Sequence, residues 1–309
     1  MKRSSTIRKI SLEKTKVVLL KAPYEKTVSG RLGASKGPQA ISKMLSYQVE
    51  EWDYLLKRNT GKEVEIIEKD VSVSKLKPEE AIAKVKQNTF FILSRGKLPV
   101  ILGGEHSVSL GAVLAAREIF GDLTVVQIDA HADLRDDNSD YEEKRGKISK
   151  YSHGCVMRRI YEAGCGIVQV GIRSMSPEEY NFIVEHKLEK NIFYAPIKKS
   201  FKEIISRCLT DKVYLTIDVD GFDPSVMPAT GTPEPGGISW EWGLQFFEKL
   251  FSQKEIVGFD IVEVTPRKDD SRTEFAAAKL LYHLIGLKYF GRHRIRRELD
   301  EKRIRREEN

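Results

Sequence analysis

The stretch VVQIDAHADLRDD, residues 125–137, joins an apolar segment to an unusual run of polar side chains. Its first residues predict a buried strand, and Asp129, His131 and Asp133 then follow at every second position. In an extended chain, side chains two residues apart point the same way. We therefore expect these three side chains to converge on one point at the end of the strand.

Strand-like and helix-like segments alternate along the rest of the chain. Short runs rich in Val and Ile are typical of strands that are buried on both faces of a parallel sheet. The predicted strands are residues 16–23, 98–104, 124–133, 165–174, 212–221 and 255–266. The predicted helices are residues 37–57, 77–96, 107–120, 176–188, 239–251 and 272–290. This alternation predicts one doubly wound α/β domain with helices on both faces of its sheet.

The net charge of +7 lies at the two ends of the chain. Residues 1–16 carry +5 and residues 291–309 carry +3, which leaves −1 for residues 17–290. We therefore expect a basic N-terminal segment, a single domain over residues 17–290 and a charged helical tail, with no nucleic-acid partner. No apolar run approaches the ~20 residues of a membrane-spanning helix, and the N-terminus lacks the apolar part of a secretory signal. A cytoplasmic location without membrane contact is the expectation.

Polar residues also follow three other predicted strands. His106 comes after residues 98–104, Asp218 and Asp220 end residues 212–221, and Glu263 lies near the end of residues 255–266. Ligands of doubly wound sheets bind beyond the carboxyl ends of the strands. These residues are therefore expected to gather at one edge of the sheet.

Four aspartates at one sheet edge need compensating positive charge. Like charges about 4 Å apart repel by several kcal/mol at intermediate dielectric, and no Lys or Arg lies within the segments that carry these aspartates. Two divalent cations would balance them, and two neutral histidines would complete an oxygen-rich site that suits Mn²⁺ better than Zn²⁺. The six predicted ligands are His106, Asp129, His131, Asp133, Asp218 and Asp220.

Three motifs together resemble the ureohydrolase family of arginases and agmatinases. They are GGEHS at residues 103–107, DAHAD at residues 129–133 and DVDGFDPS at residues 218–225, in that order. The resemblance implies a three-layer α/β/α sandwich with a central, mostly parallel sheet. It also implies two Mn²⁺ ions per subunit, held by the same six residues, and a homo-oligomer, either a trimer or a hexamer.

Within that family the chain is most similar to agmatinases. The similarity lies in YSHGCVMRRI at residues 151–160, VGIRSMS at residues 170–176 and GTPEPGG at residues 231–237. The loop at residues 134–150 lacks the Asn- and Ser-containing pattern with which arginases bind an amino acid. The predicted reaction is hydrolysis of agmatine to putrescine and urea. The alternatives are the same chemistry on arginine, guanidinobutyrate, guanidinopropionate or formiminoglutamate, or a non-catalytic relative that binds without turnover.

The resemblance also implies roles for individual residues. Two metals that share a water would supply the nucleophile, with which Asp133 forms a hydrogen bond. Glu263 would bind the guanidinium group, and His153 would pass a proton to the leaving amine. Thr232 would help to position the substrate.

Three further residues have open interpretations. Arg173 is expected to be a structural ion-pair partner, and Glu105 is either a residue that supports a metal ligand or an acid at a helix start. A covalent mechanism through Cys155 and His153 is a weaker alternative. The three cysteines are expected to be reduced, mostly buried and inert; they are Cys155, Cys165 and Cys208.

Overall fold

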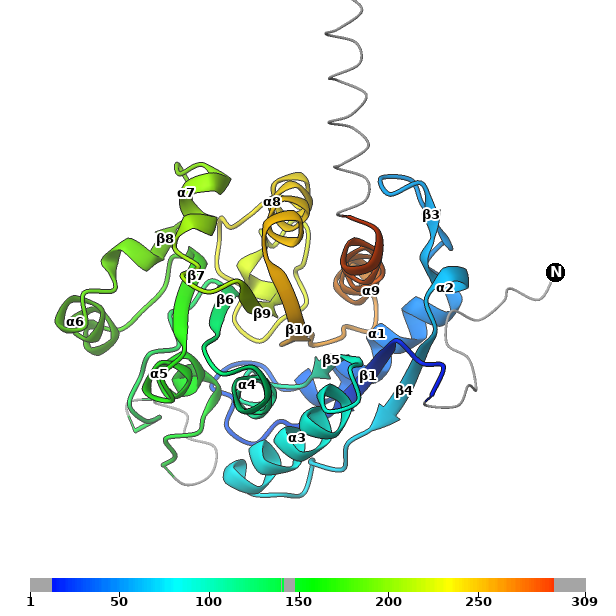
Figure 1. Ribbon diagram of the computed structural model, residues 1–309. Helices are drawn as coiled ribbons and strands as arrows, with labels where there is room; N and C mark the ends of the chain where they lie inside the picture. Colours follow the sequence, from blue (N-terminus) through cyan, green and yellow to red (C-terminus); the bar gives the residue numbers. More distant parts are fainter. Residues whose placement is uncertain (1–12, 140, 142–147, 292–309) are drawn as a thin grey trace, which may run out of the picture.

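The computed structural model describes residues 13–139, 141 and 148–291, and its centre is one eight-stranded sheet (Figure 1). The strands are β1 (Val17–Ala22), β4 (Ile66–Asp70), β5 (Leu98–Gly103), β6 (Thr124–Ile128), β7 (Gly166–Ile172), β8 (Ile192–Tyr194), β9 (Lys212–Asp218) and β10 (Glu255–Val262). They lie in the order β4-β1-β5-β10-β9-β6-β7-β8, and all neighbouring pairs are parallel. The predicted parallel sheet is confirmed.

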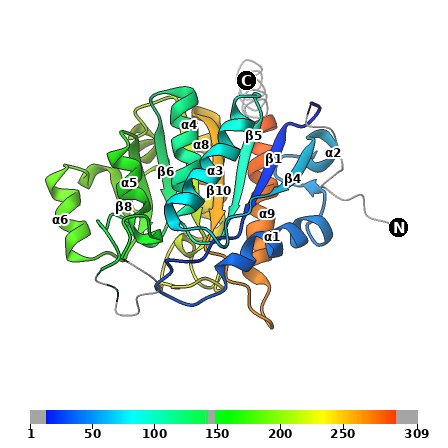
Figure 2. The same cartoon turned by 90° about the horizontal axis from the view of Figure 1, so that it is seen from below.

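Helices cover both faces of this sheet. They are α1 (Gly37–Tyr47), α2 (Thr60–Glu63), α3 (Pro78–Leu93), α4 (Val108–Phe120), α5 (Val156–Glu162), α6 (Pro177–Glu185), α7 (Phe201–Ser206), α8 (Trp240–Gln253) and α9 (Arg272–Gly286). Val18 and Leu20 of β1 pack in a core with α3, α4 and α5, whereas Val17 and Leu19 pack in a second core with α1, α8 and α9. Figure 2 shows the sheet between these helical layers. The chain is therefore a three-layer α/β/α sandwich, as expected.

The predicted helix over residues 37–57 is wrong in its second half. Helix α1 ends at Tyr47, and the chain then forms a short antiparallel hairpin. The strands of this hairpin are β2 (Trp52–Asp53) and β3 (Arg58–Asn59). The Asp53 carboxylate accepts hydrogen bonds from the N–H groups of Leu55 and Leu56, and its other oxygen lies 2.6 Å from Nδ1 of His283 in α9. A contact with a residue so distant in the sequence overrides the local helical pattern.

Besides the hairpin and the four-residue helix α2, four further short elements of the fold were not predicted. β4 and β8 form the two edges of the sheet, where β4 is partly exposed and β8 has three residues. Helices α5 and α7 have seven and six residues. Segments this short contain too few periods for a hydrophobic pattern to identify them.

The ends of the chain and part of one loop carry no structural description. Residues 1–12 of the predicted basic segment, residues 292–309 of the predicted tail, and residues 140 and 142–147 of the long loop lie outside the described residues. Within the described part of the chain, no helix is both long enough and apolar enough to cross a bilayer. The predicted division into a basic segment, a domain and a tail stays a prediction.

Candidate metal centre

The candidate site lies where four neighbouring strands end. β5, β10, β9 and β6 occupy consecutive positions in the sheet, so their carboxyl ends share one edge. The polar residues at these ends are His106 after β5, Glu263 after β10, Asp218 at the end of β9 and Asp129 after β6. Sheet order thus brings together residues that are more than 100 positions apart in the chain.

Turns, rather than one extended strand, aim the carboxylates into the site. β6 ends at Ile128, so the predicted strand over residues 124–133 is too long. Asp133 has a left-handed backbone with φ of 54°, and Glu263, immediately after β10, has φ of 63°. Asp220 lies in a single 3₁₀ turn that follows β9. Left-handed backbone is uncommon outside glycine, and such residues cluster at functional sites.

Two motif glycines allow the loops of the site to pack closely. A Cβ atom on Gly104 would lie 1.9 Å from the carbonyl oxygen of Tyr24, and one on Gly221 would lie 2.6 Å from the backbone nitrogen of Asp129. Any larger residue at either position would push apart segments that form the site.

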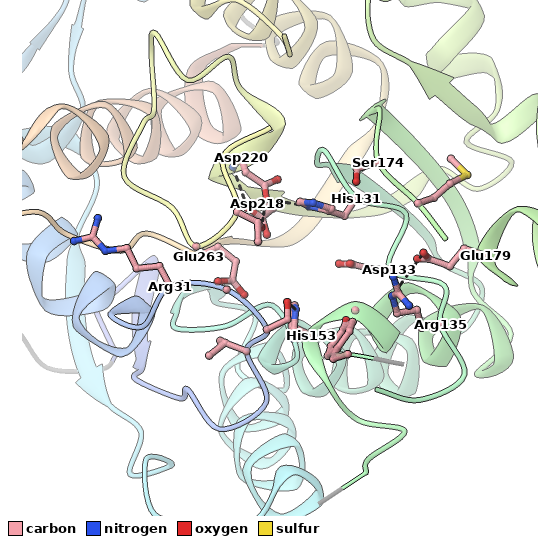
Figure 3. A pocket seen from close by; sticks show the side chains of 18 residues that line it. Arg31, His131, Asp133, Arg135, His153, Ser174, Glu179, Asp218, Asp220 and Glu263 are labelled. Carbon is pink, nitrogen blue, oxygen red and sulfur yellow. Dashed lines mark hydrogen bonds and ion pairs between the residues drawn. The ribbon is translucent and has the colours of Figure 1, made fainter. Parts of the chain in front are cut away.

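Five of the six predicted ligands form two overlapping groups. His106, Asp129 and Asp133 place their ligand atoms within 4.8 Å of one another, and so do Asp129, His131 and Asp220. Nδ1 of His106 lies 2.9 Å from Asp133 Oδ2 and 3.1 Å from Asp129 Oδ2. Nδ1 of His131 lies 3.1 Å from Asp220 Oδ2, and Figure 3 shows these two side chains facing each other.

The sixth residue, Asp218, lies beside the first group. Its Oδ2 atom is 3.6 Å from Nδ1 of His106, and its side chain is buried. The structure therefore brings all six side chains to one end of the sheet, although Asp218 belongs to neither of the two groups of tightly spaced atoms found among the described residues.

The surroundings of His106 fit a metal ion. Its Nδ1 atom is buried and, among the described residues, has no partner in hydrogen-bonding geometry, although two carboxylate oxygens lie within 3.1 Å. Its other ring nitrogen, Nε2, lies 2.8 Å from the hydroxyl of Thr216. An imidazole that donates from one nitrogen and turns the other toward carboxylates has the arrangement of a metal ligand. Carboxylates with a minority of imidazole suit Mn²⁺.

Burial and crowding shift the pKa values across the cluster. Burial, together with the charge of Asp129, raises the pKa of Asp133 to about 7. Burial and the neighbouring carboxylates raise the pKa of Asp218 well above its ordinary value. Burial opposes protonation of His106 and His131, but the aspartates outweigh it and hold both pKa values well above the ordinary histidine value. The cluster thus attracts positive charge, which protons or metal cations can supply.

A cavity of about 310 Å³ opens over this cluster. Asp133, His131, Asp218 and Asp220 contribute to its lining, so the polar cluster is accessible to a small molecule. Thr232 lies at the same cavity, with its hydroxyl 3.4 Å from Asp220 Oδ2.

His153 and Glu263 line the cavity together with the cluster, as Figure 3 shows. Nδ1 of His153 lies 2.8 Å from the carbonyl oxygen of Thr27 and therefore carries the proton, while Nε2 lies 3.1 Å from the hydroxyl of Ser29. Burial lowers the pKa of His153 to about 4, so the ring is neutral at pH 7. Glu263 accepts the backbone N–H of His106 at 2.8 Å, and burial, followed by the charge of Glu105, raises its pKa well above the ordinary value.

Glu105 holds the loop that supports His153. Its two oxygens accept hydrogen bonds from the backbone N–H groups of Lys26 and Thr27, at 2.6 and 2.7 Å, and from the Thr27 hydroxyl. Ser107 donates its hydroxyl to the same carboxylate and forms no side-chain cap on α4. Of the two interpretations of Glu105, the structure favours support of the site over a helix-start acid.

The residues that line the cavity but were not predicted are Ser29, Arg31, Arg135, Tyr141 and Glu179, among others. Ser29 and Arg31 belong to the segment after β1, and the other three come from the loop after β6 and from α6. Since β1 lies directly beside β5, the loop after β1 was a candidate for the same sheet edge. Strand order was the missing information, because no polar motif marks this loop.

The structure changes the interpretation of Arg173 and agrees with that of the cysteines. Arg173 donates its hydrogen bonds to four backbone carbonyl groups, those of Gly171, Asp220, Glu234 and Pro235. Its role is therefore structural, but within the described part of the chain it is not that of an ion-pair partner. All three cysteines are free and buried, as expected.

The covalent alternative through Cys155 also loses support. The Cys155 side chain is fully buried and contacts the Ser152 hydroxyl at 3.0 Å, and burial raises the pKa of its thiol to about 11. A thiol in this state is a poor nucleophile.

Comparisons with known proteins agree with the geometry. A model of the Arginase family matches residues 15–286. The chain is 36% identical, over 89% of both chains, to an N(1)-aminopropylagmatine ureohydrolase of Synechocystis sp.. It is 32% identical, over 90% of this chain and 94% of the relative, to an agmatinase of Pyrococcus horikoshii. The crystal structure of an agmatine ureohydrolase of Thermoplasma volcanium superposes with a TM-score of 0.74 at 30% identity, covering 91% of this chain and 92% of that one.

Proposed function

Because the chain belongs to the arginase family, we propose that it is a manganese-dependent ureohydrolase that cleaves the guanidino group of an agmatine-type substrate. The observation that carries this proposal is the pair of overlapping His/Asp groups beneath the cavity. Several relatives are enzymes of this chemistry, which disfavours the non-catalytic alternative.

Six side chains would hold two Mn²⁺ ions. Asp129 belongs to both groups of ligand atoms and would therefore contact both ions. The four positive charges of two divalent ions would balance four aspartates and so offset the burial and the repulsion that otherwise raise the pKa values of Asp133 and Asp218. The ligands would be His106, Asp129, His131, Asp133, Asp218 and Asp220.

Asp133 and Glu263 would orient the nucleophile and the substrate. The chemistry that bound Mn²⁺ would supply here is a lowered pKa of a nearby water, which gives a nucleophile at neutral pH. Asp133 would accept a hydrogen bond from this nucleophile and orient it toward the guanidinium carbon. Glu263 would bind the planar guanidinium through paired N–H···O hydrogen bonds, in the geometry that suits a carboxylate.

His153 would move the proton that the leaving amine needs. Its Nδ1–H group is fixed by the Thr27 carbonyl, so Nε2 is the atom that exchanges protons on the cavity side. With a pKa of about 4, His153 passes a proton on instead of retaining it. The water thereby contributes its oxygen to urea and both of its protons to the departing amine, which leaves as an ammonium. Thr232, beside Asp220, would position the substrate.

The substrate is proposed to be N(1)-aminopropylagmatine or agmatine. The sequence motifs led to agmatine, with putrescine as the second product, whereas four relatives at 34–36% identity are N(1)-aminopropylagmatine ureohydrolases. The two compounds share the guanidinobutylamine unit, so the same guanidinium site serves both. Arg31 and Arg135 also line the cavity and are the groups that would pair with a carboxylate-bearing substrate, so such compounds belong in the test.

A hydrolysis assay across a panel of substrates tests this proposal. Mn²⁺-loaded protein is given agmatine, N(1)-aminopropylagmatine, arginine, guanidinobutyrate, guanidinopropionate and formiminoglutamate at matched concentrations. We expect agmatine or N(1)-aminopropylagmatine to have a kcat/KM at least about tenfold above the remaining four compounds. A cavity that fits a substrate ending in an amine discriminates against substrates that carry a carboxylate there. A preference for arginine or for a guanidino acid would refute the proposed substrate class.

Other properties stay predictions from the sequence. They are a cytoplasmic location, a homo-oligomer of three or six subunits, and the absence of nucleic-acid and membrane partners. The substrate is expected to be a small cationic guanidino compound.

A further inference from the structure

A row of buried polar side chains crosses the middle of the sheet beneath the candidate metal centre. It consists of Gln169 on β7, Gln127 on β6, Thr216 on β9 and Asp260 on β10, and we call these four residues the polar row. Each is a register partner of the next, and all four are completely buried. Four polar residues at one level of an apolar sheet are costly unless each finds a partner.

The polar row points toward the face of the sheet that α4 covers. The residues that flank Gln127, Val126 and Ile128, pack in the core on the opposite face. Side chains alternate along a strand, so Gln127 and its register partners point toward α4. Helix α4 begins at Val108, two residues after His106, which places the polar row next to the candidate ligands of the first metal.

One half of the polar row orients His106. The Thr216 hydroxyl lies 2.6 Å from Asp260 Oδ1 and 2.8 Å from Nε2 of His106. A hydroxyl has only one proton to donate. Thr216 donates it to the carboxylate of Asp260, which is the shorter contact, and therefore accepts a hydrogen bond from the Nε2–H group of His106. Tyr214 donates to the other oxygen of Asp260 at 2.9 Å and holds this carboxylate in place. With Nε2–H held by Thr216, Nδ1 is the ring nitrogen of His106 that faces the aspartates.

The other half of the polar row orients Asp129. Nε2 of Gln127 donates to Asp129 Oδ2 at 2.6 Å, and Oε1 of Gln127 accepts a hydrogen bond from Gln169. Gln169 also donates to the backbone carbonyl of Ala132, at 2.6 Å, in the loop that carries His131 and Asp133. A chain of amides thus fixes the one carboxylate that both candidate metal groups share.

We propose that the polar row positions the two metal ligands: Thr216 and Asp260 fix the tautomer and ring orientation of His106, and Gln127 and Gln169 fix the carboxylate of Asp129. The inference rests on the proposed function, since it takes both residues as Mn²⁺ ligands. Its consequence is specific. Loss of the Thr216 hydroxyl weakens the ion beside His106 alone, whereas loss of the Gln127 amide weakens both ions.

The test measures Mn²⁺ binding to metal-free protein by titration calorimetry. Thr216→Val removes the hydroxyl and keeps the shape of the side chain. We expect one of the two Mn²⁺ dissociation constants to rise by about 10- to 100-fold while the other stays unchanged. Thr216→Ser keeps the hydroxyl and should restore tight binding at both sites. Thr89→Val is the matched control, since Thr89 is also fully buried, its hydroxyl has no partner among the described residues, and it lies in α3.

Gln127→Met gives an independent second variant, because Met has nearly the shape of Gln but no amide. We expect both dissociation constants to rise in this variant. The inference is overturned if Thr216→Val binds both ions as tightly as the unaltered chain, or weakens both equally together with a lower melting temperature of the metal-free protein. If the unaltered chain itself fails to bind two ions, the proposed function fails as well, so the two failures are distinguishable.

Discussion

The Asp133→Asn variant is expected to lose activity by at least about 10³-fold, because one carboxylate serves both metal binding and the orientation of the nucleophile. Asn has nearly the shape of Asp and tolerates the left-handed backbone that Asp133 adopts, with φ of 54°, so the fold should survive. Steady-state hydrolysis of the preferred substrate and the manganese content of the purified variant are the two measurements. The manganese content should fall together with turnover.

A matched control separates this effect from a general loss of acidic charge. Asp223 lies in the same DVDGFD segment as Asp218 and Asp220, but its carboxylate accepts the backbone N–H of Ser225, and it is not one of the six proposed ligands. Asp223→Asn should therefore retain nearly full turnover and two ions. Wild-type turnover in Asp133→Asn would contradict the assigned role of Asp133.

The Glu263→Gln variant is expected to lower kcat/KM by about 10²- to 10³-fold, since truncating one partner of a desolvated charge pair costs several kcal/mol. Glu263 lines the cavity and is not one of the six proposed ligands, so the manganese content should not change. Loss of activity with full metal content is the signature that distinguishes a substrate-binding carboxylate from a metal ligand.

Glu274→Gln provides the comparison for Glu263. Glu274 is also a buried glutamate, 5% exposed compared with 7% for Glu263, but it lies in α9 and does not line the cavity. Its substitution should leave kcat/KM nearly unchanged. If Glu263→Gln turned over substrate as well as Glu274→Gln does, Glu263 would not be the guanidinium-binding group.

The sheet edge that carries the site could be predicted because strand periodicity and strand-end chemistry are local signals. Runs of Val and Ile marked β5, β6, β9 and β10, and the residues that follow them carry the polar groups. The parallel arrangement of these strands then places their carboxyl ends at one edge. Four of the eight strands were enough to locate the candidate site.

The backbone conformation of the residues that follow the strands could not be predicted. The alternation of Asp129, His131 and Asp133 suggested an extended strand, but β6 ends at Ile128 and Asp133 is left-handed. Nothing in a non-glycine residue type announces a positive φ, because such a conformation is imposed by the surrounding packing. The same holds for Glu263.

Contacts between distant segments also escaped prediction. The hairpin after α1 depends on the pairing of Asp53 with His283, and the polar row depends on knowing that β7, β6, β9 and β10 are neighbours. Gln127, Thr216 and Asp260 interrupt apolar strands, which was a visible signal, but only sheet order shows that they lie side by side. Tertiary information decides such cases, and a single sequence does not contain it in readable form.

Crystals of the protein grown with Mn²⁺, with diffraction recorded at the manganese absorption edge, test the central claim most directly. The account predicts two anomalous peaks per chain, one beside His106 and one beside His131, with Asp129 next to both. A single peak, or peaks away from these residues, would contradict it.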